Sequence, residues 1–399
     1  MRPIHHALVL NLHQPAGNLQ ELWQKNPWEA KEILFALDRI PRSLWGYEDL
    51  ARVHLSLSGT LLETLSDPEF QAKAYGTVDL GSLLWYYQNT ALFEILGTAY
   101  YHPVLPLIPQ ADWKEQLVRW LGIGRHLFWR EKFQGFWPPE MGFCMELIPL
   151  LCGLGYRYVL VDSEHVEPIT PMDWPKLMYR PHLARYQGKE IVVIVRDRDL
   201  SNAQESGLEP EWFCREVEER TRWCDAPPLV TTCTDGDNGG WFRNVTYGAN
   251  FWTAFYVPML ERARCDPSVP QPIFIHDYLD RYGAHGEVKV HTGAWNTGWH
   301  HGRGFIQWTG SQRQKEGLAA IHSFSQRLHE LKRCVAESHY RDLKLEELLE
   351  RAMGCLLRAE TSCNFFWGEA WVERAERDLK AAEESLAAAE KRLRAQDYL

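Results

Sequence analysis

The sequence has 399 residues, with 43 lysines and arginines against 53 aspartates and glutamates, and a formal net charge of -10. This length suits one large domain with an appendage. The acidic balance argues against a nucleic-acid partner, because proteins that bind nucleic acids usually present a basic face. The first apolar run, residues 7–10, is too short for a signal peptide, and no segment is long enough to span a bilayer. We therefore expect a cytoplasmic protein with no membrane partner.

Cysteine and aromatic residues narrow the function classes further. The 9 cysteines are scattered singly without a Cys-x-x-Cys pair, which is typical of reduced thiols in the cytoplasm. Aromatic content is high, with 18 Trp, 16 Tyr and 16 Phe. Sugar rings present apolar C–H faces that pack on aromatic rings. A carbohydrate site is therefore one explanation of this content, and a tryptophan-rich core is the other.

In the first part of the chain, short apolar segments alternate with segments of helical periodicity. The expected strands are residues 7–12, 52–57, 97–101, 135–137, 156–161, 191–195, 229–233 and 288–291. The expected helical segments are residues 28–37, 61–93, 113–128, 147–154 and 209–224. This alternation predicts about seven or eight parallel βα units, a number that closes into a barrel.

Polar side chains follow these strands, all at the same end. They are His13, His102, Glu140, Asp162, Asp235 and His291. In an α/β barrel the carboxyl ends of the strands meet at one mouth, where the active site lies. The convergence predicts a functional site there.

Glu140 stands out within the stretch from Gln134 to Phe143. The aromatic run before it is typical of a buried strand. Pro138 and Pro139 cannot donate to a sheet ladder, so the strand must end there. Glu140 therefore stands either as a catalytic carboxylate at a strand end or as a surface side chain after a turn.

After about residue 310 the sequence becomes rich in Ala, Leu, Glu, Lys and Arg, and its apolar residues recur with helical periodicity. The expected helices are residues 311–337, 343–361 and 370–396. We expect a catalytic domain over 1–310 and a C-terminal helical domain over 311–399. The aromatic loop 363–368 between the last two helices either reaches the barrel mouth or plugs the core between the domains.

Two carboxylates on different strands of one mouth, Glu140 and Asp235, are the minimum set for glycoside hydrolysis. Asp237 lies two residues after Asp235, and like-charge repulsion would raise the pKa of Asp235 and help it to hold a proton. A tight turn or a calcium loop is the alternative for this acidic, glycine-containing segment. The segment lacks the ligand spacing and the final Glu of an EF-hand.

Five motifs in order resemble those of glycoside hydrolase family 57. They are His13-Gln14-Pro15, Tyr101-His102-Pro103, Trp137-Pro138-Pro139-Glu140, Asp235-Gly236-Asp237 and Cys363-Asn364-Phe365-Phe366-Trp367. The fourth has Asp where the family usually has Glu, and the fifth has Asn364 in place of the usual Asp. The motifs extend over nearly the whole chain.

The resemblance implies an α/β fold with an incomplete (β/α)7 barrel, a C-terminal helical domain, and a retaining enzyme acting on α-glucans. Glu140 is then the nucleophile and Asp235 the acid/base. The residues expected to contact an α-glucan or maltooligosaccharide are His13, Gln14, His102, Trp137, Asp237, Trp241, Trp295, Trp299, Asn364 and Trp367. Trp295 and Trp299 either stack on glucose rings or pack on the helical domain.

Two other functions stay open from the sequence. An inactive glucan-binding relative would keep the fold without the reaction. Residues 232–236 also resemble the Thr-x-Asp-Asp-Gly motif of metal-dependent polysaccharide deacetylases, which need a His-x-x-x-His motif as well. That motif is absent, so we expect no metal and no cofactor.

Overall fold

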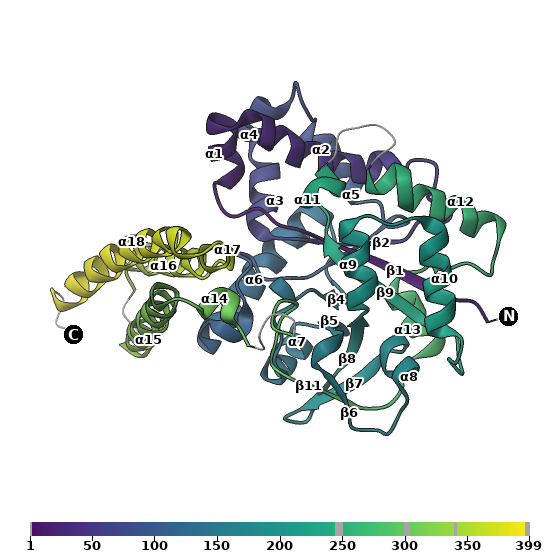
Figure 1. The fold of residues 1–399 in the computed structure, drawn as a ribbon. Helices are drawn as coiled ribbons and strands as arrows, with labels where there is room; N and C mark the ends of the chain where they lie inside the picture. The colour runs from purple at the N-terminus through teal and green to yellow at the C-terminus, as the bar shows by residue number, and fades with distance from the viewer. Residues whose placement is uncertain (1, 244–249, 299–303, 339–340, 396–399) are drawn as a thin grey trace.

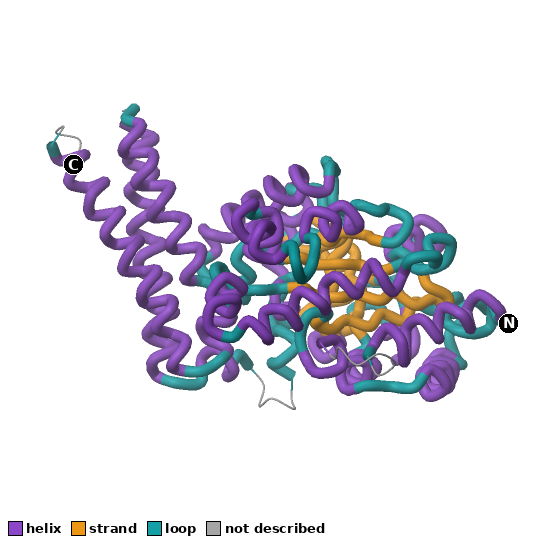
Figure 2. Tube along the Cα trace, turned by 90° about the horizontal axis from the view of Figure 1, so that it is seen from above, coloured by secondary structure: helices purple, strands orange, loops and turns teal. Residues whose placement is uncertain are grey.

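The structure is a computed structural model that describes residues 2–243, 250–298, 304–338 and 341–395. It is a mixed α/β structure followed by a mostly helical C-terminal region (Figure 1). The strands lie inside the larger part with helices around them, as Figure 2 shows in a second view.

The first sheet is built around β1 (His5–Leu12), whose eight residues are all buried. Such continuous burial is typical of a parallel strand covered on both faces. Strand β1 pairs in parallel with β2 (Val53–Leu57), β9 (Leu229–Asp235) and β10 (Gln271–Pro272). Strand β3 (Phe93–Leu96) pairs in parallel with β2.

The second sheet contains β4 (Gly135–Phe136), β5 (Tyr158–Asp162) and β8 (Lys189–Arg196) in parallel, with β7 (His182–Tyr186) antiparallel to β8. A single bridge between Gly97 and Phe136 links β3 to β4. On the other side, Asp197 N–H donates to the carbonyl of Thr231 at 2.9 Å, which links the end of β8 to β9. The described strands therefore form two linked sheets and not one continuous closed sheet.

Two of the predicted strands are wrong in position or in partner. The strand expected at 97–101 lies earlier, at Phe93–Leu96. Helix α5 (Leu80–Tyr87) ends before it, and a turn in which Asn89 accepts from the N–H of Ala91 leads directly into the strand. The strand expected at 288–291 is β11 (Val288–Val290), which pairs antiparallel with β6 (Val166–Pro168) in a separate two-stranded sheet. His291 therefore does not follow a strand of the common edge, and its Nε2 lies 2.6 Å from Glu167.

Helices cover the sheets, and several begin where a polar side chain accepts a backbone N–H. Such capping residues are Asn26, Ser58, Asp67 and Asp79. The helices are α1 (Asn18–Lys25), α2 (Pro27–Leu44), α3 (Gly59–Ser66), α4 (Pro68–Ala74), α5 (Leu80–Tyr87), α6 (Gln110–Phe128), α7 (Ile148–Gly153), α8 (Trp174–Tyr179), α9 (Arg198–Ser206), α10 (Pro210–Thr221), α11 (Gly239–Arg243), α12 (Val257–Cys265) and α13 (Ile275–Tyr282).

The interior between the two sheets contains an apolar cluster. It contains Val9 of β1, Leu160 of β5 and Ile194 of β8, with Tyr278 of α13 packed against them. Helix α13 therefore contributes to this cluster from a part of the chain distant from β1.

The C-terminal region consists of α14 (Ile306–Thr309), α15 (Gln312–Ser338), α16 (Leu343–Ala359), α17 (Cys363–Phe366) and α18 (Glu369–Arg394). The three expected helices are confirmed to within a few residues. Helices α15, α16 and α18 extend away from the sheets (Figures 1 and 2). Their apolar cluster also includes Val104 and Ala294 of the α/β part. No helix of the described residues is long and apolar enough to cross a membrane.

Candidate active site

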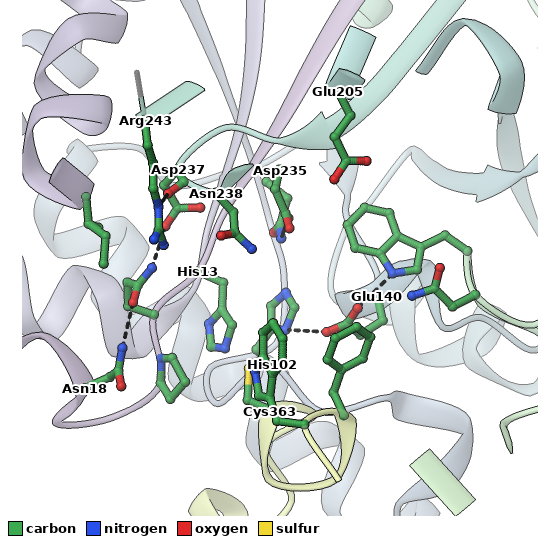
Figure 3. A pocket seen from close by; sticks show the side chains of 18 of the residues that line it. His13, Asn18, His102, Glu140, Glu205, Asp235, Asp237, Asn238, Arg243 and Cys363 are labelled. Atoms are coloured by element: carbon green, nitrogen blue, oxygen red, sulfur yellow. Dashed lines mark hydrogen bonds and ion pairs between the residues drawn. The ribbon is translucent and has the colours of Figure 1, made fainter. Parts of the chain in front are cut away.

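A cavity of about 670 Å³ lies at the carboxyl ends of β1 and β9 and reaches the C-terminal helices (Figure 3). Eight of the predicted site residues line it: His13, Gln14, His102, Glu140, Asp235, Asp237, Trp295 and Trp367. They come from six separate segments of the chain. The fold therefore brings most of the predicted site together.

The backbone of Glu140 has left-handed geometry, with φ of 55° after Pro138 and Pro139 have ended the strand. The carboxylate is held at both oxygens. Oε1 accepts a hydrogen bond from Ser362 Oγ at 2.8 Å, and Oε2 accepts one from Trp295 Nε1 at 2.8 Å. Glu140 is only 8% exposed. Burial raises the pKa of Glu140, whereas the hydrogen bonds from Ser362 and Trp295 oppose that rise.

Asp235 is the last residue of β9 and lies opposite Asn11 of β1. Its Oδ1 accepts a hydrogen bond from Asn11 Nδ2 at 2.9 Å. Burial and then the neighbouring charge of Asp237 raise the pKa of Asp235 well above its usual range, while the Asn11 hydrogen bond opposes this, and Glu140 adds to the rise. Asp235 is therefore the carboxyl group with the stronger tendency to keep its proton.

Asp237 is held in place by Gln14, whose Nε2 donates to Oδ2 at 3.0 Å. Gln14 in turn accepts from Asn18 Nδ2 at 2.9 Å, so an amide chain fixes the carboxylate from the α1 side. Burial raises the pKa of Asp237 to about 6, although the Gln14 hydrogen bond opposes this. Asp237 therefore titrates near neutral pH and influences the charge of Asp235.

The rings of His13 and His102 are stacked, with centroids 3.9 Å apart and planes at 7°. Burial lowers the pKa of His102 to about 3 and lowers that of His13 well below its usual range, so both rings are neutral. Among the described residues, both ring nitrogens of His13 and Nε2 of His102 are buried without a hydrogen-bond partner. A neutral imidazole nitrogen can donate or accept a hydrogen bond, so these atoms have unused hydrogen-bonding capacity beside the cavity.

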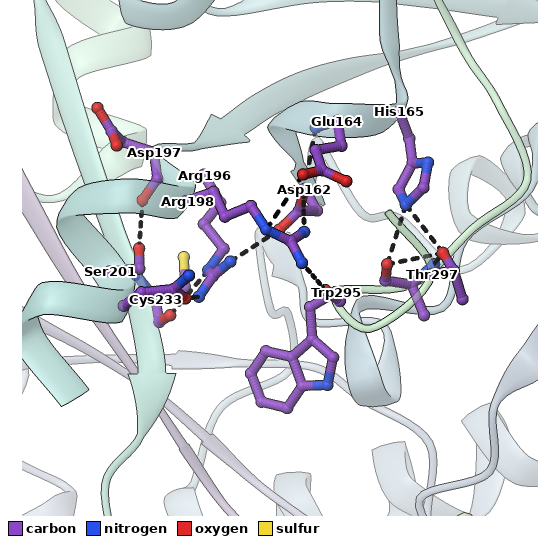
Figure 4. A network of polar contacts seen from close by, with 12 residues as sticks. Asp162, Glu164, His165, Arg196, Asp197, Arg198, Ser201, Cys233, Trp295 and Thr297 are labelled. Carbon is purple, nitrogen blue, oxygen red and sulfur yellow. Dashed lines mark hydrogen bonds and ion pairs between the residues drawn. The ribbon is translucent and has the colours of Figure 1, made fainter. Parts of the chain in front are cut away.

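Trp295 is positioned by a buried network of charges (Figure 4). Arg198 Nη2 donates to the carbonyl of Trp295 at 2.6 Å, and Arg198 Nη1 donates to Asp162 Oδ1 at 2.9 Å. Arg196 Nη1 donates to the other oxygen of Asp162 at 2.7 Å. Asp162, which we expected at the mouth, is thus neutralised by two guanidinium groups and supports the loop that carries Trp295.

Three predicted site residues do not line this cavity. Trp137 is fully buried, and its ring contacts that of Trp295 with centroids 5.7 Å apart. Trp241 packs against the ring of Phe251, with centroids 6.4 Å apart. Asn364 Nδ2 donates to the carbonyl of Ala359 at 3.0 Å at the end of α16. Trp299 lies outside the described residues.

The sequence that forms this site matches a known protein family. The model described as glycosyl hydrolase family 57 matches residues 7–291, which is most of the chain. The chain belongs to glycosyl hydrolase family 57. The resemblance inferred from the five motifs is thereby confirmed.

Relatives within family 57 are distant in sequence. The chain is 24% identical to an α-amylase of Pyrococcus horikoshii over 203 residues, which covers 50% of this chain and 29% of that protein. It is 20% identical to α-amylase 1 of Dictyoglomus thermophilum over 306 residues, covering 74% of this chain and 40% of that protein. The chain thus spans less than half the length of these curated relatives.

Solved structures show the same fold over nearly the whole chain. The branching enzyme of P. horikoshii has a TM-score of 0.72 at 15% identity, with 98% of this chain and 88% of that chain covered. The α-amylase of Thermotoga maritima has a TM-score of 0.70 at 13% identity, with 100% and 96% covered. At such identities the likeness is one of fold.

Sequence reasoning missed several residues that line the cavity of this family 57 chain. They include Asn11, Arg196, Arg198, Glu205 and Trp371. It also missed Ser362, which bonds Glu140 although it stands directly before the fifth motif. Ser362 could have been found by extending that motif by one residue, whereas the arginines act through contacts that no local pattern shows.

Within residues 2–243, 250–298, 304–338 and 341–395, no group of three or more His, Cys, Asp or Glu side chains is placed to hold a metal ion. Independence of the reaction from metal stays a prediction, and turnover in the presence of a chelator is the measurement that decides it.

Proposed function

We propose that this protein is a retaining α-glucan hydrolase or transglycosylase that forms a covalent glycosyl-enzyme on Glu140. The observation that carries the proposal is that Glu140 and Asp235 line one cavity in different environments. Glu140 accepts two hydrogen bonds that favour its ionised form, as a nucleophile requires. The pKa of Asp235 is raised well above its usual range, as a general acid requires.

The reaction then proceeds in two steps. Glu140 attacks the anomeric carbon while Asp235 gives its proton to the glycosidic oxygen of the leaving chain. Asp235 next removes a proton from water or from a sugar hydroxyl. The oxygen of that molecule attacks the anomeric carbon and displaces Glu140, which restores both carboxyl groups. A retaining mechanism requires the two carboxyl groups to lie about 5–5.5 Å apart when substrate is bound.

Substrate binding uses the remaining cavity wall. The unpartnered nitrogens of His13 and His102 receive sugar hydroxyls beside the two carboxyl groups. Trp295 and Trp367 line the same cavity and offer ring faces for stacking. The names of the relatives, α-amylase and branching enzyme, support an α-glucan as the substrate class.

We also propose that the two linked sheets act as the incomplete (β/α)7 barrel of the sequence prediction. The bridge from β3 to β4 and the hydrogen bond from β8 to β9 support this arrangement. The division into a catalytic domain over 1–310 and a C-terminal helical domain over 311–399 belongs to the same proposal.

The test is incubation of the protein with maltooligosaccharides and with starch, followed by measurement of reducing ends and chain lengths. Rising reducing ends indicate hydrolysis, and redistributed chain lengths at constant reducing ends indicate transfer. Binding of glucan with neither change would contradict the proposal and favour an inactive glucan-binding relative.

A further inference from the structure

Ser362 lies between α16 and α17, in the C-terminal helical region, and is 1% exposed. Its hydroxyl donates to Glu140 Oε1 at 2.8 Å, across 222 residues of sequence. The C-terminal region thus contacts the carboxylate of the α/β part directly. The other carboxylate oxygen, Oε2, accepts a hydrogen bond from Trp295 of the α/β part.

The backbone around Ser362 is fixed to the segment that follows β3. Ser362 N–H donates to the carbonyl of His102 at 3.0 Å. Thr361 and Pro103 form an antiparallel bridge beside it. These two contacts hold the Ser362 hydroxyl at a defined place relative to His102 and Glu140.

The hydrogen bonds of Ser362 have a defined direction. An ionised carboxylate only accepts, so the single hydroxyl proton of Ser362 points to Glu140. His102 Nδ1 lies 3.3 Å from Ser362 Oγ, so Nδ1 of the neutral ring must be the donor to that oxygen. Nε2 of His102 is then the acceptor nitrogen, which is buried and unpartnered.

We propose that Ser362 is a positioning residue, a hydroxyl supplied by the C-terminal region that orients the Glu140 carboxylate and keeps it ionised for attack. This inference rests on the proposed function of Glu140. Ser362 acts through Glu140 and not on the substrate. With one donor on each oxygen, the carboxylate plane is fixed, and a carboxylate fixed in the attacking orientation reacts faster than a rotating one.

Other titratable groups face Glu140 and bear on any pH measurement. His102 Nδ1 lies 3.8 Å from Oε1. Burial is the main cause of the raised pKa of Asp235 and of the Cys363 thiol, and the charge of Glu140 adds to both rises. His102 stays neutral over the working range because burial lowers its pKa to about 3. Removal of the Ser362 hydroxyl leaves these three groups in place.

The test compares Ser362→Ala with the wild type and with Ser325→Ala. Ser325 is a matched control because it is also buried in the C-terminal region, and its hydroxyl has no hydrogen-bond partner in the part of the chain that the structure describes. We expect Ser362→Ala to move the acidic limb of the kcat/KM profile upward by about one pH unit, since a lost hydrogen bond to a carboxylate disfavours its charged form. The basic limb should stay where it is, and Ser325→Ala should change neither limb.

A direct titration makes the test independent of turnover. Carbon-13 NMR of glutamate-labelled protein, with Glu140→Gln to assign the signal, gives the titration midpoint of Glu140. We expect Ser362→Ala to raise that midpoint by about one pH unit, and an unchanged midpoint would overturn the inference. Failure of the proposed function is distinguishable, because Glu140→Gln would then turn over glucan as fast as the wild type.

Discussion

A buried charge network in the α/β part contrasts with an exposed ion pair in the C-terminal helical region. In the α/β part, Asp162 is buried with Arg196 and Arg198, and the three side chains are 0%, 3% and 8% exposed. In the C-terminal region, the Arg313–Glu376 pair is 39% and 47% exposed. Removing one member of a buried pair leaves an unpaired charge, whereas exposed pairs contribute little. The buried network therefore positions a loop of the site, whereas the exposed pair lies on the surface.

Apolar contacts link the two regions to each other. The C-terminal helices pack into a cluster of their own, with Leu328, Leu356 and Leu386 at its centre. That cluster also takes in Val104 and Ala294 from the α/β part. The helical region therefore depends on the α/β part for its core, while the α/β part depends on the helical region for Ser362 and Trp367 at the cavity.

Removing the C-terminal region would break this mutual dependence and has the largest expected effect. A chain that ends at residue 310 loses Ser362 and the cavity residues Phe366, Trp367 and Trp371, and exposes Val104 and Ala294. We expect an insoluble protein or one without detectable turnover, as measured by solubility and by glucan assays. A soluble fragment with full activity would show that the site is complete within the α/β part.

Glu140→Gln tests the α/β side of the comparison alone. Gln cannot form the glycosyl-enzyme, so we expect kcat to fall by roughly 10⁴-fold or more. The side chain keeps its size, so glucan binding should remain, as measured by calorimetry. Near-normal turnover would remove Glu140 from its proposed role.

Asp235→Asn removes the proton donor and should have a smaller, substrate-dependent effect. Natural glucans have poor leaving groups, so we expect their turnover to fall by about 10²–10⁴-fold. An activated aryl glycoside needs less help from the acid and should lose less. Because burial raises the pKa of Asp235, the wild type should keep its activity to a higher pH than an ordinary aspartic acid allows, and the basic limb of the profile should disappear in Asp235→Asn. Equal losses on both substrates would contradict this assignment.

Asn364→Asp tests a structural contact within the C-terminal region, between α17 and the end of α16. Asn364 Nδ2 donates to the carbonyls of Arg358 and Ala359, and a carboxylate has no proton to donate to them. We expect a loss of about 1–3 kcal/mol in the free energy of unfolding, measured by denaturant titration. Asn364→Ala, which removes the donor without adding charge, should lose less. A fully stable Asn364→Asp protein would show that these hydrogen bonds are not needed.

The smallest effect is expected at the exposed pairs of the helical region. Arg327 donates to both carboxylate oxygens of Glu383 at 2.8 Å, yet both side chains are nearly half exposed. We expect Arg327→Ala to lower the free energy of unfolding by less than about 1 kcal/mol. The loss should shrink at high salt, and a larger loss that persists in salt would mean that Arg327 contributes through packing on Phe324.

The sequence was sufficient for those parts of the fold that depend on local patterns. Strands β1 and β8 carry continuous apolar runs because helices and sheet cover both faces, and both were predicted. The three C-terminal helices have clear periodicity, and they too were predicted. Strand β11 was placed with the wrong partner because pairing depends on contacts distant in sequence, here with β6.

The candidate site likewise has residues that local patterns predict and contacts that they do not. Glu140 and Asp235 stand directly after strand patterns, so their convergence on one cavity could be expected. The hydrogen bond of Ser362 to Glu140 and that of Arg198 to the Trp295 carbonyl link segments far apart in the chain. No local pattern contains such contacts, because only the packed chain brings the partners together.

The left-handed backbone at His102 and Glu140 sets the chemistry of the cavity against local backbone strain. Residues other than glycine cost roughly 1 kcal/mol or more in this conformation, and here the φ angles are 56° and 55°. Glycine adopts it freely, so a glycine at either position would relax the local strain while removing the side chain from the cavity. At Glu140 it would also remove the carboxylate that accepts from Ser362 and Trp295. The strained backbone is therefore inseparable from the contacts that build the cavity.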